Sequence, residues 1–124
     1  MFSQIKTSKR NKELVSKLTN KLNLGPENII ARIALAYSLA NDEKLDIKDI
    51  KDSGGKEYSK GVLFGENIDI YIGLICIKYN FHSSHKDIGS YIKLHLDHGL
   101  ELIEQEFEKN GQFNNVDFIL KLAN

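Results

Sequence analysis

Two histidines on one predicted helix are the residues of this sequence best suited to metal or acid–base chemistry. His95 and His98 lie three positions apart, so their side chains share one helical face. Such a pair can bind one metal ion, but zinc hydrolases of the common type need histidines four apart with a glutamate between them, which is absent. His95 also falls within an apolar stripe. We therefore expect a hydrogen-bonded core histidine, and neither a metal nor another cofactor.

The single cysteine, Cys76, excludes an intramolecular disulfide and a cysteine-rich zinc site, and it fits a reducing cytosol. Its neighbours in residues 73–77 are apolar, whereas a reactive thiol needs a basic, partly open setting. We therefore expect a small buried side chain. Glu57, Glu66 and Asp69 surround a glycine-spaced stretch, but carboxylates there are typical of helix caps and ion pairs. The sequence predicts no catalytic residue, and the protein is not expected to be an enzyme.

Hydrophobic spacing predicts one all-α domain over residues 1–124, with about five helices. Residues 53–65 are expected to form a structured loop and not a phosphate cradle, because no Gly-Lys-Ser/Thr motif is present. In residues 68–79 the apolar side chains occupy alternate positions, as in a strand, but the length of this segment favours a helix. No apolar stretch approaches the roughly 20 residues that span a bilayer, so we expect no membrane contact. The expected elements are a short extended lead-in at residues 5–7 and helices at 8–22, 26–40, 68–79, 85–108 and 116–122.

Charge is unevenly distributed along the chain. Seventeen basic and seventeen acidic residues cancel overall, but residues 1–35 carry seven basic against two acidic side chains, a net charge of +5, and residues 36–124 carry −5. On the first predicted helix Arg10, Lys17 and Lys21 fall within an arc of about 40° on an exposed flank. Such a flank can neutralise phosphates. The candidate DNA-binding residues, called the basic N-terminal set below, are Lys6, Lys9, Arg10, Lys12, Lys17 and Lys21.

Three stretches in order resemble a known family. The first is Ile29–Leu35 continued by Ser38–Leu39, the second is Gly55–Tyr58 leading to Leu63–Glu66, and the third is His95–Leu100. Their order and spacing are similar to those of the DNA sulfur modification protein DndE, over roughly residues 5–105. That family belongs to the bacterial system that replaces a non-bridging phosphate oxygen of DNA with sulfur.

The resemblance implies a helical, non-catalytic, DNA-binding subunit in the cytoplasm, with nicked duplex as a suggested preference. It also implies a homo-oligomer, with a tetramer expected, that works beside other Dnd proteins, including a cysteine desulfurase and a sulfur-transferring partner. Within the motifs we expect Gly65 to form a tight turn, Gly99 to allow close helix packing and Arg32 to pair with a carboxylate such as Glu66. Cys76 as a sulfur carrier is disfavoured by its apolar neighbours.

Two other functions remain open at this point. The order strand, helix, Gly-Pro turn and helix also permits a ribbon-helix-helix regulator, in which Gln4, Lys6 and Ser8 would read base edges. Alternatively, the protein is an adaptor that binds a basic partner and not DNA. The acidic residues that would dock such a partner are Asp97, Glu101, Glu104, Glu106 and Glu108.

Overall fold

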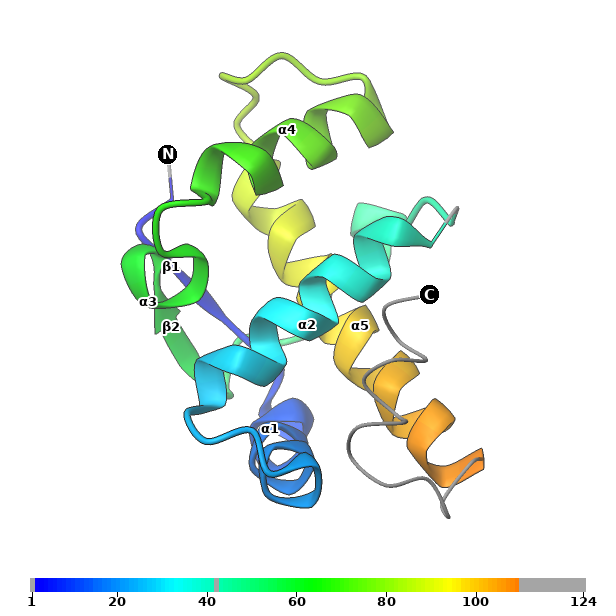
Figure 1. Cartoon of the computed structure of the whole chain (residues 1–124). Coiled ribbons are helices and arrows are strands. Elements are labelled where there is room, and N and C mark those ends of the chain that lie inside the picture. Colours follow the sequence, from blue (N-terminus) through cyan, green and yellow to red (C-terminus); the bar gives the residue numbers. More distant parts are fainter. Residues whose placement is uncertain (1, 42, 110–124) are drawn as a thin grey trace.

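A computed structural model describes residues 2–41 and 43–109 of the chain (Figure 1). The predicted mainly helical class is confirmed, with a short N-terminal strand as expected. The described elements are β1 (Gln4–Lys6), α1 (Lys9–Leu22), α2 (Glu27–Ala40), the 3₁₀ turn η1 (Ile47–Asp49), β2 (Glu57–Ser59), α3 (Lys60–Phe64), α4 (Ile68–Tyr79) and α5 (Ile88–Lys109).

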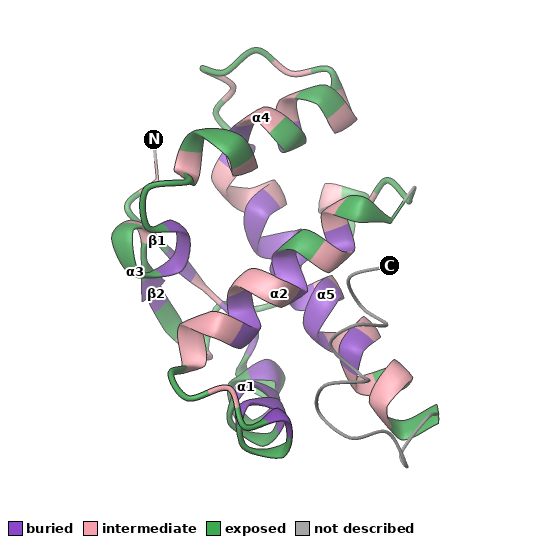
Figure 2. Cartoon of the chain, in the orientation of Figure 1, coloured by how far each residue is buried: buried purple, intermediate pink, exposed green. Residues whose placement is uncertain are grey.

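The core forms where α2 crosses the long helix α5 (Figure 1). Helices α1 and α4 pack against opposite ends of α5, and the buried sides of all four helices turn toward one another (Figure 2). The crossing is close because Gly99 has no side chain: a Cβ there would lie 1.9 Å from the carbonyl oxygen of Ala34. The expected packing role of Gly99 is therefore confirmed.

Local sequence signals account for both ends of α1. Ser8 caps the helix by accepting a 3.2 Å hydrogen bond from the amide of Asn11 onto its side-chain oxygen. Asn23 ends the helix in the left-handed conformation, with a φ of 54°. Gly25 follows with a φ of 81°, which suits a residue without a side chain, and Pro26 lies next to the start of α2.

The expected loop at residues 53–65 is wrong in part, because it contains β2 and α3. β2 pairs with β1 in antiparallel register, so that Ile5 lies opposite Tyr58 and both side chains are buried. Gly55 permits this pairing, since a Cβ at that position would lie 2.0 Å from the carbonyl oxygen of Ser8. A three-residue strand and a five-residue helix are too short to produce a hydrophobic period that sequence reasoning can detect.

The helix predicted at residues 68–79 is confirmed as α4, but it is less buried than its composition suggests. Its buried residues are Ile72 and Ile75, and Cys76 is half-buried instead of buried as expected. The helix expected at residues 116–122 lies outside the described residues. Among the helices that the structure describes, none is both long and apolar enough to cross a bilayer.

Candidate nucleic-acid interface

The basic N-terminal set lies along β1 and α1, on the surface of the molecule. Lys9 and Lys12 are exposed, and within the described residues neither ammonium group has an ion pair or a hydrogen bond. The chain holds the start of this helix in place partly through Asp52, whose side-chain oxygen accepts a 2.9 Å hydrogen bond from the amide of Lys9. These two lysines are therefore available to a phosphate group.

The flank formed by Arg10 and Lys17 faces the carboxylates of α5. Arg10 Nη2 donates a 2.8 Å hydrogen bond to Glu104 Oε1, and its Nη1 lies 3.9 Å from Glu101. Lys17 Nζ lies 3.7 Å from Glu104 and 3.9 Å from Glu108. The hydrogen bond and the negative charge of Glu104 raise the pKa of Arg10 above its usual value. The helical wheel predicts that this flank is exposed, but in the structure its cations pair with acidic side chains of α5.

The remaining two members of the set also have partners inside the chain. Lys6 Nζ lies 3.5 Å from Glu57, its neighbour across the two-stranded sheet. Lys21 Nζ lies 5.1 Å from the ring centroid of Phe107, in cation–π contact. Surface ion pairs of this kind contribute only about 0–1 kcal/mol, so a phosphate can replace a carboxylate at little cost.

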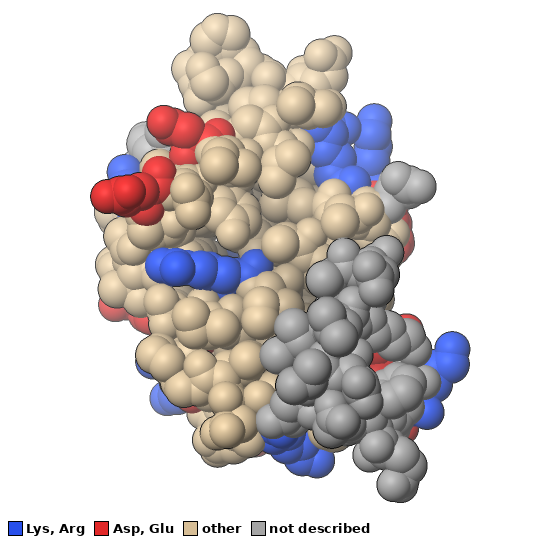
Figure 3. Space-filling view, in the orientation of Figure 1, with Lys and Arg blue, Asp and Glu red and all other residues tan. Residues whose placement is uncertain are grey.

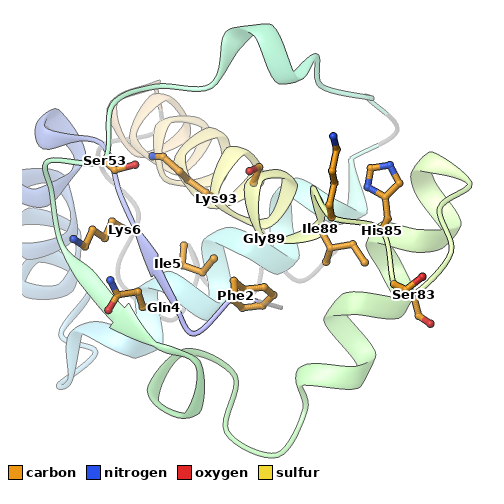
Figure 4. Close-up of a pocket in the computed structure, with 13 residues that line it drawn as sticks. Phe2, Gln4, Ile5, Lys6, Ser53, Ser83, His85, Ile88, Gly89 and Lys93 are labelled. Carbon is orange, nitrogen blue, oxygen red and sulfur yellow. The ribbon is translucent and has the colours of Figure 1, made fainter.

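An open pocket of about 720 Å³ adjoins the set beside Lys6 (Figure 4). It lies between β1, the loop at Ser53 and the first turns of α5, and none of its described lining residues is acidic. Lys86 and Lys93 also line it, together with four serines. Lys93 is already paired with Asp97 at 2.8 Å, so Lys86 is the lysine in the pocket with no ion pair among the described residues.

The two histidines form a hydrogen-bonded network with α2 and α4. Ser38 Oγ lies 2.8 Å from Nδ1 of His95 and 2.8 Å from Nδ1 of His98. Tyr79 Oη lies 2.6 Å from Nε2 of His95 and accepts a 2.9 Å hydrogen bond from the amide of Leu45. Burial lowers the pKa of His95 to about 4, so its imidazole is neutral near pH 7. The expected core histidine is confirmed.

Because His95 is neutral, one of its ring nitrogens donates and the other accepts, so Tyr79 and Ser38 have opposite roles toward it. Ser38 has a single hydroxyl proton, so it donates to Nδ1 of one histidine and accepts from Nδ1 of the other. His98 Nε2 lies 3.7 Å from Glu43 Oε2. The network ties α2, α4 and α5 together, which is a structural role for both histidines.

The sequence matches the family described as DNA sulphur modification protein DndE over residues 4–110. The chain belongs to the DndE family. Membership in this family indicates a role in DNA sulfur modification. No curated protein matches the sequence. The fold is similar to that in the crystal structure of DndE from Escherichia coli B7A involved in DNA phosphorothioation modification, with a TM-score of 0.67 and 18% identity, covering 82% of this chain and 95% of that one.

The motifs that resemble DndE in the sequence contact one another in the structure. Arg32 Nε donates to the carbonyl of Leu63 at 2.7 Å, and its Nη2 donates to the carbonyl of Val62 at 3.0 Å. The expected ion pair with Glu66 is wrong, because the described contacts of the guanidinium are with these carbonyls. Gly65 turns the chain there with a φ of 57°, as expected. Arg32 thus joins the first DndE motif to the second.

Sequence reasoning missed a buried ion pair on α5, between Lys93 and Asp97, that also anchors the start of α1. Asp97, in the third DndE motif, accepts hydrogen bonds from the amide of Ser8 at 3.0 Å and from Asn11 Nδ2 at 2.8 Å. Its other oxygen accepts from Lys93 Nζ at 2.8 Å. All four residues are buried. The i, i+4 spacing of Lys93 and Asp97 was the available signal, but such spacing is more typical of an exposed helix face.

Proposed function

We propose that the chain is a non-catalytic DNA-binding subunit of the phosphorothioation machinery, acting in the cytoplasm as a homo-oligomer beside other Dnd proteins. The observation that carries this proposal, beside the family, is the exposure of Lys9 and Lys12 without a carboxylate partner among the described residues. Cations on an exposed helix neutralise DNA phosphates and release counterions, so binding is independent of base sequence and sensitive to salt.

The six residues of the basic N-terminal set contribute unequally in this proposal. Lys9 and Lys12 meet phosphates directly. Arg10 and Lys17 must first exchange their carboxylates on α5 for phosphate oxygens, so their contribution is smaller. Few phosphate contacts per subunit mean weak binding by one copy. A homo-oligomer multiplies the contacts and raises affinity through avidity.

The exposed side of α2 supports self-association. Arg32 is the basic residue of this helix, and the face seen over α2 in Figure 3 is otherwise largely uncharged. Ile29, Ile33 and Tyr37 on that helix are only half-buried within one chain. The tetramer that we expect would cover such side chains, and a native mass measurement determines the number of subunits.

Salt titration of duplex binding tests the proposed surface. The Lys9→Glu/Lys12→Glu variant should lose most of its affinity, whereas Arg10→Glu/Lys17→Glu should lose less. Lys44→Glu/Lys48→Glu makes the same charge change in the segment between α2 and β2 and serves as the control. Equal loss in all three variants, or no loss in the first, would reject this surface. Comparing intact with nicked duplex in the same titration tests the suggested preference.

Neither alternative function gains a supporting observation. A ribbon-helix-helix regulator pairs its N-terminal strand with that of a second copy, whereas β1 here is hydrogen-bonded to β2 of its own chain. An adaptor docked through the acidic residues of α5 would have to displace the cations of the same chain that pair with Glu101, Glu104 and Glu108, whereas phosphate binding at Lys9 and Lys12 requires no such exchange.

A further inference from the structure

Helix α4 carries a stripe of apolar side chains that is exposed to solvent. Ile70, Leu74 and Ile77 are 61%, 42% and 82% exposed, and their steps of four and three place them on one helical face. Figure 2 shows the outer side of this helix as exposed and intermediate. Aliphatic side chains gathered in this way on one face mark a contact with another molecule.

Beside the stripe is Gly73, where no contact among the described residues requires a glycine. Gly73 lies in the middle of α4, where glycine destabilises a helix relative to alanine. At Gly99 the neighbouring helix leaves no room for a Cβ, but at Gly73 a Cβ would meet nothing within 4 Å. The missing side chain therefore leaves an open hollow next to Leu74, on the outer surface of the helix.

The two isoleucines of the stripe, Ile70 and Ile77, are equally far from the point between Gly73 and Leu74, which is also the midpoint of α4. About this point the counterpart of Leu74 is Gly73. In a two-fold contact, if residue i touches residue j of the second copy, residue j touches residue i. Two antiparallel copies of α4 then place each Ile70 against Ile77 of the other copy, and each Leu74 over the hollow at Gly73.

Charge at the ends of α4 favours the same arrangement. Asp69 is in its first turn and Lys78 in its last turn. Antiparallel packing brings Asp69 of one copy to the same end of the pair as Lys78 of the second copy, and it also opposes the two helix dipoles. Parallel packing would instead group like charges.

We propose that α4 is a two-fold contact between two copies of this chain, formed by antiparallel packing about Gly73 and Leu74. The occupant is a second copy because the pattern is complementary to itself, a property that contact with an unrelated protein does not require. This inference rests on the self-association in the proposed function and names one of its contacts. The DNA surface on α1 is independent of it.

Disulfide cross-linking tests the arrangement in a Cys76→Ser background. One chain carries Ile70→Cys and another carries Ile77→Cys. The mixture should form a disulfide-linked pair, whereas each chain alone should not. In the antiparallel pair, residue 70 of one copy lies about 10 Å along the helix axis from residue 70 of the other copy, and the same holds for residue 77. This separation exceeds the roughly 7 Å between Cα atoms that a disulfide allows. Cross-linking of either chain alone would show another register, and no cross-link in the mixture would overturn the proposal.

Native mass measurement separates failure of this contact from failure of self-association. Gly73→Leu fills the hollow and Ile77→Glu charges the stripe, so each should weaken self-association at least tenfold while the circular dichroism stays unchanged. Ile50→Glu, at an exposed isoleucine outside α4, is the matched control. Oligomers unaffected by the two α4 variants would overturn the α4 contact and leave self-association standing. A monomer at every concentration would overturn both, whereas DNA binding is measured separately.

Discussion

Arg10 on α1 and Glu104 on α5 join the most basic helix of the chain to its most acidic region through a 2.8 Å hydrogen bond. The two residues are 94 positions apart in the sequence. Lys17 shares the same carboxylate at 3.7 Å, so Glu104 sets how much of the positive flank of α1 is available to another anion.

Removing the charge of Glu104 should strengthen DNA binding. Glu104→Gln frees Arg10 and Lys17 for phosphates, so we expect several-fold tighter binding to duplex at low salt and a steeper salt dependence, by about one phosphate per subunit. Fluorescence anisotropy across a salt series measures both. Glu13→Gln removes one negative charge from α1 itself and is the control. If Glu13→Gln has the same effect as Glu104→Gln, net charge alone explains the gain and release of the two cations does not.

Asp97 should be a major determinant of stability. Asp97→Ala leaves the buried ammonium of Lys93 without its ion-pair partner and the capped start of α1 without an acceptor, so we expect a loss of about 3–5 kcal/mol in the free energy of unfolding. Urea denaturation measures this loss. Glu101→Ala, on the more exposed side of α5, should cost less than about 1 kcal/mol. A cost for Asp97→Ala as small as that of the control would contradict the structural role assigned to it.

His95 should make the protein less stable in mild acid. Its pKa is about 4 in the folded chain and about 6.5 when exposed, so the unfolded chain binds more protons between these values. The free energy of unfolding should therefore fall as the pH falls from about 6.5 toward 4, by about 3 kcal/mol in total. Denaturation at each pH measures the slope, and a slope that His95→Gln leaves unchanged would assign the effect to other groups.

The crossing of α2 and α5 should tolerate no side chain at Gly99. Gly99→Ala places a methyl group within 1.9 Å of the carbonyl oxygen of Ala34, so the helices must separate, and we expect a loss of about 1–3 kcal/mol or more. Gly61→Ala, in α3, meets nothing within 4 Å and should change stability by less than about 1 kcal/mol. Thermal unfolding compares the two variants, and equal melting temperatures would be incompatible with the close crossing described.

The sequence alone determined the helical class and most helix boundaries. Ser8, Gly25 and Pro26 are local signals, because capping and turn conformations depend on neighbours in the chain. The apolar stripe that includes His95 likewise predicted a buried histidine, which is confirmed. The strand β2 and the helix α3 were missed because they are short and are stabilised by pairing with β1 and by packing on distant elements.

Only the tertiary structure decided which charges of the candidate site are free. A helical wheel places Arg10 and Lys17 on an exposed flank, but it contains no information on which helix lies beside that flank. The approach of α5 supplies Glu104, whereas no carboxylate among the described residues pairs with Lys9 or Lys12. Side-chain spacing is a property of one helix, whereas electrostatic neutralisation depends on distances between helices, which the fold alone determines.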